Sequence, residues 1–390
     1  MTGPYRILYH HRIRADDGQA VHVRELIAAL REAGHEVLEC ALVQKSSGGD
    51  GPPSGARFWQ GLSLPRRAVE VLEVGYNARG LAMLTNAARS FRPDFVYERH
   101  SLHLGAGLLA ARALRVPLLL EVNSPLVDEM DRDGLVGFKR TARFTERAVL
   151  SRADRVLAVT EVLRQLLIPL GATPERTLVI GNGADPRRFD EGIKRAGQER
   201  RRALGIPAEA SVVGFIGYMR PWHRLDLLLE AMAQPDLAQI HALLIGEGPA
   251  LGPTLDRAQS LGLGRRVHAI GKVPGKELPP LAAALDVALI PAINAYASPL
   301  KLFDSLAAGV ATLAPDQPNL RENIHDRETG VLFRPDDAAS LTDALRWLHA
   351  DPTRTARIGA AGRQALIDRD WTWAGNARRV VAAFEAARRG

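Results

Sequence analysis

The segment SPLKLFDSLAAG, residues 298–309, has the residue types and spacing that point most directly to chemistry. Ser298 can cap a helix, and Pro299 suits the first helical position, where its missing N–H needs no partner. The other free N–H groups of that turn and the helix dipole favour an anion, and Lys301 adds a full positive charge. Asp304 would repel an anion but can accept hydrogen bonds from ribose hydroxyls. Gly309 is expected to end the helix. The segment therefore predicts a site for a phosphate joined to a neutral group. The alternative is an ordinary capped helix.

Length and composition indicate a soluble protein of two domains. The chain has 390 residues, 46% hydrophobic and 24% charged, which is more than one hydrophobic core usually supports. The single cysteine, Cys40, excludes an internal disulfide and a cysteine metal cluster and fits a reducing cytoplasm. No stretch reaches the roughly 18 apolar residues of a membrane span. The amino terminus runs directly into a strand, so we expect no signal peptide and a cytoplasmic location.

The formal net charge of +7 is spread over both halves of the chain and does not favour a nucleic-acid groove. The one local concentration of arginines is Arg57–Arg92, where apolar side chains are interspersed. This segment predicts a possible peripheral contact with an anionic membrane surface or an acidic acceptor. The alternative is an ordinary helix whose arginines reach into solvent.

Short apolar strands alternate with helical patterns along the whole chain. Residues 6–10, a helix from about Gln19 and residues 36–42 form a βαβ unit, and the alternation restarts at 212–217. This pattern predicts an α/β fold with two Rossmann-like, doubly wound parallel-sheet domains facing a cleft. The predicted domains are residues 1–188 and 189–371, followed by a carboxyl-terminal helix, residues 372–390, that packs back toward the first domain.

Five motifs occur in a fixed order over nearly the full length of the chain: Asn182–Asp185, Gly217–Leu229, Gly246–Pro249, Lys301–Gly309 and Glu328–Leu332. In this order they resemble the retaining nucleotide-sugar glycosyltransferases of the GT-B fold, glycosyltransferase family 4 in particular. The segments Tyr97–His100 and Pro221–His223 are similar to a branch that carries Glu-Arg and Pro-Trp-His at these places.

The resemblance implies that the carboxyl-terminal domain binds a nucleoside-diphosphate sugar and that the amino-terminal domain binds the acceptor. The Lys301 helix would contact the diphosphate, Asp304 the ribose, and the loop after Gly271 the base, while Gly18 would let the backbone approach the phosphates or the sugar. The implied donor-binding residues are Gly18, Gly217, His223, Gly246, Gly271, Lys272, Val273, Ser298, Pro299, Leu300, Leu302 and Asp304.

The chain departs from the family pattern at several positions. In the family, the first of two acidic residues recognises hydroxyls of the donor sugar. Tyr296 occupies the place of that residue, so this chain lacks the carboxylate there. Tyr218 and His223 align with the usual phosphate-binding Arg and Lys, and Asn123 stands where the family often has His. Guanidinium and ammonium groups suit a diphosphate. The available replacements are Arg220, Arg224 and Lys301.

The family implies transfer with retention of anomeric configuration, through attack on the face that the diphosphate leaves. Positive groups would stabilise the departing diphosphate. The acceptor hydroxyl could lose its proton to a side chain or to the leaving phosphate itself, and no metal or other cofactor is expected. The residues predicted to take part in catalysis, including three alternative bases, are Lys301, Arg220, Arg224, Glu98, Glu121, Asn123 and His100.

Two other functions are compatible with a pair of α/β domains. A nucleotide-sugar 2-epimerase would need a carboxylate and histidine set that the spacing does not reveal. A hinged sugar-binding protein would normally carry a secretory signal or a DNA-binding helix pair. The sequence leaves open the nucleotide base, the transferred sugar, the acceptor, the catalytic base and the oligomeric state.

Overall fold

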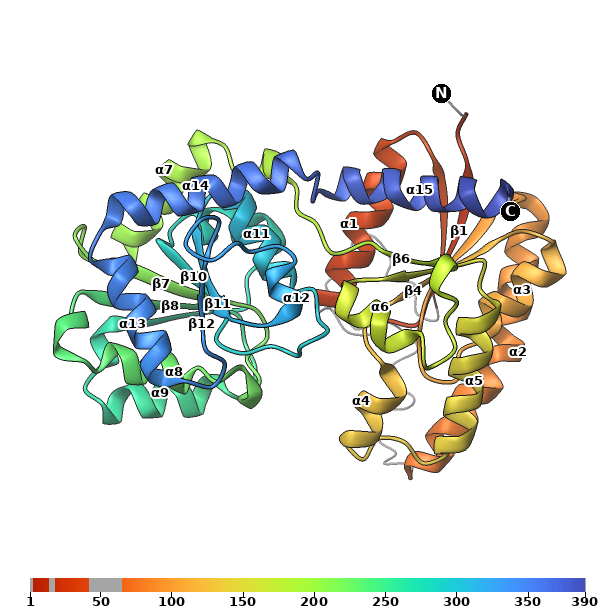
Figure 1. The fold of residues 1–390 in the computed structure, drawn as a ribbon, viewed down its shortest axis with the longest axis horizontal. Helices are drawn as coiled ribbons and strands as arrows, with labels where there is room; N and C mark the ends of the chain where they lie inside the picture. Colours follow the sequence, from red (N-terminus) through yellow and green to blue (C-terminus); the bar gives the residue numbers. More distant parts are fainter. Residues whose placement is uncertain (1–2, 14–17, 42–64, 390) are drawn as a thin grey trace. The chain divides into compact units, whose positions relative to one another are not determined.

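The chain divides into two compact units. The computed structural model describes residues 3–13, 18–41 and 65–389. Unit 1 comprises Met1–Gly181 with Asn376–Gly390, and unit 2 comprises Asn182–Gly375 (Figure 1). The predicted boundaries, after residues 188 and 371, lie a few residues from these divisions.

Unit 1 is built on a six-stranded sheet in the order β2-β1-β3-β4-β5-β6, and every neighbouring pair of strands is parallel. Every residue of β3 and β4 is buried, as expected for parallel strands that are covered on both faces. The predicted apolar face of α1 is confirmed, since Val23, Leu26, Ile27 and Leu30 are buried. The elements are β1 Arg6–His11, α1 Gly18–Glu32, β2 Glu36–Ala41, α2 Arg66–Phe91, β3 Phe95–Arg99, α3 Ala106–Leu114, β4 Leu118–Val122, α4 Leu126–Arg132, α5 Lys139–Arg152, β5 Arg155–Ala158, α6 Glu161–Leu167 and β6 Thr177–Val179.

Unit 2 repeats this architecture with the strand order β12-β11-β10-β7-β8-β9, again parallel throughout. The two sheets confirm the predicted pair of Rossmann-like domains. The elements are α7 Glu191–Ala203, β7 Ser211–Ile216, α8 Asp226–Met232, β8 Ile240–Ile245, α9 Leu251–Ser260, β9 Val267–Gly271, α10 Leu278–Ala282, β10 Val287–Leu289, α11 Leu300–Ala308, β11 Ala311–Pro315, α12 Pro318–Arg321, β12 Val331–Phe333, α13 Ala338–His349 and α14 Pro352–Asp368.

Two hydrophobic clusters cover the two faces of the second sheet. Successive residues of β7 alternate between them, with Val213 and Phe215 in one cluster and Val212 in the other. Helices α8 and α13 supply the first cluster, and α11 supplies the second through Leu302, Phe303 and other apolar residues. This packing fixes the axis of α11, so its first turn lies at the carboxyl edge of the sheet, where ligands bind in such folds.

The last helix, α15, spans Trp373–Arg389, and its residues from 376 onward belong to unit 1. There Phe384 stacks on Phe95 of β3 with 4.5 Å between ring centroids, and the Tyr5 hydroxyl donates a 3.0 Å hydrogen bond to Glu385. Over residues 3–13, 18–41 and 65–389, no helix is long and apolar enough to cross a membrane.

Candidate functional site

Three glycines of the predicted donor set adjoin one another at the carboxyl edge of the second sheet. The Gly217 N–H donates to the Ile245 carbonyl at 2.9 Å, and the Gly246 N–H donates to the Gly271 carbonyl at 2.8 Å. Gly246 has φ of +132°, and a Cβ atom there would lie 2.1 Å from the Gly217 carbonyl oxygen. Only glycine therefore allows the turns after β7 and β8 to lie this close together.

The start of α11 differs from the sequence prediction. Pro299 occupies the capping position and Leu300 the first helical position, with no side-chain cap. The prediction that Ser298 caps the helix is wrong, because its hydroxyl instead accepts a 3.0 Å hydrogen bond from the Asn182 N–H. Gly309 ends the helix in the left-handed region with φ of +71°, as predicted.

Lys301 extends from the first turn of α11 over an aromatic ring. Its Nζ lies 3.8 Å from the centroid of the Phe215 ring, and its Nζ and Cε lie beside Gly217. His223 packs edge-on against the same ring, with 4.9 Å between centroids, and is buried. Phe215, Gly217, His223 and Lys301 are called the Lys301 cluster below.

The electrostatics of the Lys301 cluster favour an anion. Burial lowers the pKa of Lys301 to about 7. Burial, followed by the charges of Lys301 and Arg220, lowers the pKa of His223 to about 3, so this imidazole is neutral. Lys301 forms no ion pair with any residue that the structure describes. An incoming diphosphate would supply the missing negative charge and stabilise the protonated amine.

The other predicted cationic groups near this edge are arranged differently. The Arg220 guanidinium lies 5.2 Å from the centroid of the Tyr218 ring. Arg224 forms ion pairs with Asp226 at 2.9 Å and with Asp336 at 3.0 Å, which compensate its charge. Lys272 is exposed and lies 4.0 Å from a Glu247 carboxylate oxygen.

The remaining residues of the predicted donor set differ in how far their side chains are buried. The side chains of Pro299 and Leu302 are buried, and Val273 packs on the adjoining hydrophobic cluster. Leu300 and Asp304 are half-buried on α11. Gly18 is the first residue of α1, and the predicted turn before it, residues 15–17, lies outside the described residues.

In unit 1 the carboxylate of Glu121 lies at the centre of a buried hydrogen-bond network. It accepts from His22 Nε2 at 2.9 Å, the Tyr97 hydroxyl at 2.7 Å and Asn123 Nδ2 at 2.6 Å, and it forms an ion pair with Arg99. Burial would raise the pKa of Glu121, but His22 and Arg99 outweigh it and hold this pKa well below its usual range. Glu121 is therefore ionised, and it fixes the orientation of Asn123.

Glu98 and His100 lie close together in sequence but in different surroundings. Glu98 is fully buried, and its carboxylate bonds to His10 Nδ1 at 2.6 Å and accepts from the Gly107 N–H at 2.8 Å. Neither ring nitrogen of His100 has a hydrogen-bond partner among the described residues, and Nε2 lies 4.0 Å from Glu146. Burial lowers the pKa of His100, so the ring is neutral and retains a free lone pair.

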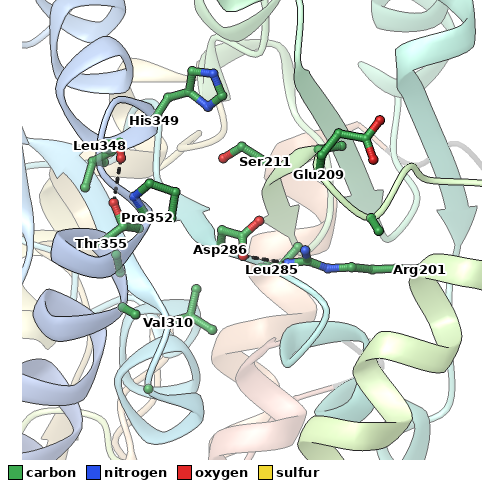
Figure 2. A pocket seen from close by; sticks show the side chains of 15 residues that line it. Arg201, Glu209, Ser211, Leu285, Asp286, Val310, Leu348, His349, Pro352 and Thr355 are labelled. Atoms are coloured by element: carbon green, nitrogen blue, oxygen red, sulfur yellow. Dashed lines mark hydrogen bonds and ion pairs between the residues drawn. The ribbon is translucent and has the colours of Figure 1, made fainter.

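A separate hollow of about 400 Å³ lies at the opposite, amino-terminal edge of the second sheet (Figure 2). Ser211 and Ala311, the first residues of β7 and β11, line it, and Arg201 pairs with Asp286 across it at 2.8 Å. No residue predicted to bind the donor lines this hollow, so we do not assign the site to it.

The sequence analysis missed some residues that shape these sites. Asn182 belongs to a recognised motif, but its bond to Ser298 joins positions 116 residues apart. Phe215 occurs in an ordinary apolar strand, and His22 in an ordinary helix, so neither carried a signal.

No group of three His, Cys, Asp or Glu residues that could hold a metal ion occurs in the described part of the chain.

Comparisons with known proteins match both units. A model of the glycosyl transferase 4-like domain matches residues 17–183, and a model of glycosyl transferases group 1 matches residues 197–365. A D-inositol 3-phosphate glycosyltransferase of Corynebacterium efficiens is 27% identical over 306 residues, which cover 75% of this chain and 71% of that protein.

Solved structures extend the likeness over the whole fold. Anabaena HepE in complex with UDP has a TM-score of 0.75 and 18% identity, with 98% of this chain and 100% of that chain covered. The same protein in complex with UDP-glucose has a TM-score of 0.73 and 17% identity, with the same coverage. These likenesses agree with the two-sheet architecture described above.

Proposed function

The chain belongs to the GT-B glycosyltransferases of family 4, and from this premise we propose that it moves a sugar from a nucleoside-diphosphate sugar to an acceptor hydroxyl. The observation that carries the proposal is the Lys301 cluster at the carboxyl edge of the second sheet, where the Lys301 amine has no counter-ion among residues 3–13, 18–41 and 65–389. The donor diphosphate would bind at the first turn of α11, against the Lys301 ammonium and the free backbone N–H groups.

In the proposed reaction the bond between the anomeric carbon and the diphosphate breaks, and a bond from the acceptor oxygen forms on the same face of the sugar. Lys301 stabilises the charge that accumulates on the departing phosphate, with Arg220 near it. The acceptor proton passes to that phosphate or to His100, whose neutral ring keeps a free lone pair. The proposed mechanism uses no metal ion.

The proposed role of the Glu121 network is to orient groups of unit 1 that contact the acceptor or the transferred sugar. An ionised carboxylate with four partners is a poor proton acceptor, whereas Asn123 is firmly held by it. The UDP-glucose complex of HepE suggests UDP-glucose as the first donor to try, and the Corynebacterium relative suggests D-inositol 3-phosphate as the first acceptor. We also propose a cytoplasmic location, which the single, buried Cys40 supports.

The proposal is tested by thermal shift with UDP, GDP and ADP, followed by nucleotide release from a panel of donor sugars in the presence of acceptors. The thermal stability of a transferase should rise with one of the nucleoside diphosphates. In the second assay a transferase should free that nucleotide from its donor sugar only when an acceptor is present. Interconversion of the sugar without an acceptor would instead support an epimerase. Stabilisation by free sugar alone would support a binding protein.

The affinity for UDP is expected to fall as the pH rises above 7. The amine must be protonated to neutralise the diphosphate, and its pKa in the free protein is about 7. The dissociation constant should therefore rise roughly tenfold per pH unit between pH 7 and 9. Isothermal titration calorimetry in buffers of different ionisation enthalpy should also detect proton uptake on binding.

The matched control for this titration is Lys301→Arg, because a guanidinium stays protonated over the whole range. Its UDP affinity should be nearly independent of pH. A pH profile shared by the wild type and this variant would show that another group controls binding.

A further inference from the structure

Exposed hydrophobic side chains concentrate on one part of unit 1. Of the thirteen large hydrophobic residues that are exposed in the described chain, seven lie on α2, α3 and the segment from the end of α4 into α5. Phe144 has the largest exposed fraction, 75%. The seven residues are Val71, Leu72, Val74, Leu109, Leu135, Phe138 and Phe144.

The exposed stripe of α5 combines this aromatic side chain with positive charge. Arg140, Phe144 and Arg147 are exposed and follow at helical spacing, so they lie along one face. The only acidic residue of α5, Glu146, is buried. The helix therefore presents no negative charge on this face.

The exposed stripe of α2 has the same character. Arg67, Val71, Val74 and Ala78 share one face of this helix and are all exposed. The two acidic residues of α2 are directed elsewhere: Glu70 is buried, and Glu73 pairs with Arg66 at 3.2 Å. This face of α2 therefore combines apolar side chains with Arg67, and neither acidic residue of α2 belongs to it.

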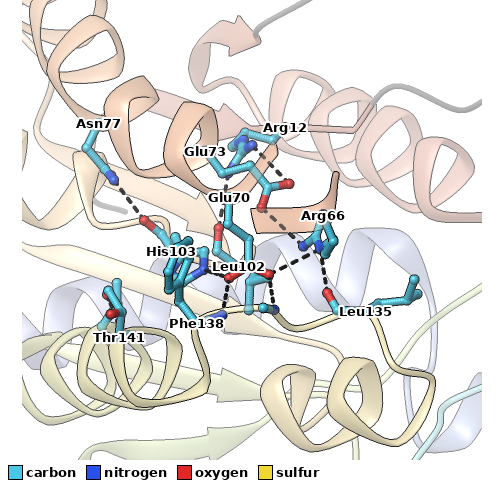
Figure 3. Close-up of polar contacts among 12 residues, drawn as sticks. Arg12, Arg66, Glu70, Glu73, Asn77, Leu102, His103, Leu135, Phe138 and Thr141 are labelled. Atoms are coloured by element: carbon cyan, nitrogen blue, oxygen red, sulfur yellow. Dashed lines mark hydrogen bonds and ion pairs between the residues drawn. The ribbon is translucent and has the colours of Figure 1, made fainter. Parts of the chain in front are cut away.

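A buried carboxylate joins the beginnings of these two helices (Figure 3). Glu70 of α2 accepts from the Phe138 N–H at 2.9 Å and contacts His103 Nε2 at 3.0 Å. The Arg67 guanidinium lies 5.8 Å from the centroid of the Phe138 ring. The beginnings of α2 and α5 therefore lie side by side at Arg67 and Phe138, and the exposed stripes of the two helices are together called the α2–α5 surface below.

We propose that the α2–α5 surface docks on an anionic lipid bilayer. Protruding apolar side chains can enter the headgroup region while the surrounding arginines contact lipid phosphates. Asp128 and Asp131 of α4 form ion pairs with Arg143 and Lys139 of α5, so these two acidic charges next to the surface are compensated. An acidic protein partner is less favoured, because Val71, Val74 and Phe144 on these faces are apolar and exposed.

This inference does not rest on the proposed function. It extends the predicted membrane contact of Arg57–Arg92 to α5, and residues 57–64 of that segment lie outside the described residues. The bound state would hold unit 1 at the membrane without any spanning helix, and it would bring acceptors with lipid tails within reach of this unit.

The test is cosedimentation of the full chain with phosphatidylcholine vesicles, with and without phosphatidylglycerol, at low and high salt. Wild-type protein should bind only the anionic vesicles, and more weakly at high salt. Phe144→Ser should weaken binding about tenfold, and Arg140→Gln or Arg147→Gln about fivefold each. The matched controls are Leu166→Ser on α6, 41% exposed in the same unit, and Arg195→Gln on the exposed side of α7.

An unchanged circular dichroism spectrum and melting temperature in each variant would show that the fold is intact, so a loss of vesicle binding would support the proposal. Equal binding to neutral and anionic vesicles, or equal losses in the control variants, would overturn it. A wild-type dimer in light scattering that Phe144→Ser converts to a monomer would also overturn it, since the surface would then bind a second copy of the chain.

Discussion

Replacing Lys301 with alanine is expected to lower turnover about 10²- to 10³-fold and to abolish stabilisation by UDP. The variant removes the amine that lies over the Phe215 ring and that has no counter-ion in the described part of the chain. Loss of a single preorganised charge donor to a developing anion typically has an effect of this size. Single-turnover kinetics with saturating donor would separate the loss of binding from the loss of transition-state stabilisation.

The matched control is Lys194→Ala, at an exposed lysine of α7 in the same unit, which pairs with Glu191 at 2.7 Å and is not among the predicted donor-binding residues. Its turnover should stay within a few-fold of the wild type, because the charge of an exposed amine is largely screened. Wild-type turnover in Lys301→Ala would contradict the proposed donor site. So would equal losses in both variants.

The second large effect is expected for Glu121→Ala, which should destabilise the protein by about 3–5 kcal/mol. The variant leaves Arg99 and His22 buried without the carboxylate that compensates them. In a unit of this size, such a loss corresponds to a decrease in melting temperature of roughly 10 °C or more. Glu121→Gln keeps hydrogen-bonding capacity at this position and should lose less stability, while the altered orientation of Asn123 should lower kcat.

The pH dependence of this contribution has a defined direction. The pKa of Glu121 is lower in the folded protein than its ordinary value of 4.5, so the stabilisation is complete above that value and is lost as the pH falls. Glu39→Gln is the matched control, since this carboxylate is 43% exposed and pairs with His11 at 3.0 Å, and its loss should cost less than about 1 kcal/mol. Glu121→Ala with wild-type stability, or Glu121→Gln with wild-type kcat, would argue against the network.

Sequence periodicity was sufficient to predict the fold. The four apolar positions of α1 and the glycine that ends α11 are local features, and the structure confirms both. Alternation of strands with helices defines the doubly wound architecture, because parallel strands need crossover connections. Each of these inferences depends on residues that are close in sequence.

The errors and omissions concern contacts between distant positions. Ser298 was expected to cap its own helix, but the Asn182 N–H occupies its hydroxyl. The Glu121 network joins residues of α1, β3 and the end of β4, and no spacing rule connects them. The depressed pKa of Lys301 likewise depends on burial by the folded domain, which a sequence motif does not report.

The position of Lys301 over the Phe215 ring has a spectroscopic consequence. An aromatic ring current shields nuclei that lie above its plane, so the ε-methylene protons of Lys301 should resonate upfield of those of ordinary lysines. The chain has six lysines, so a sample labelled only at lysine would give a sparse spectrum in which this signal stands apart. That resonance offers a direct reporter of when the amine leaves the ring.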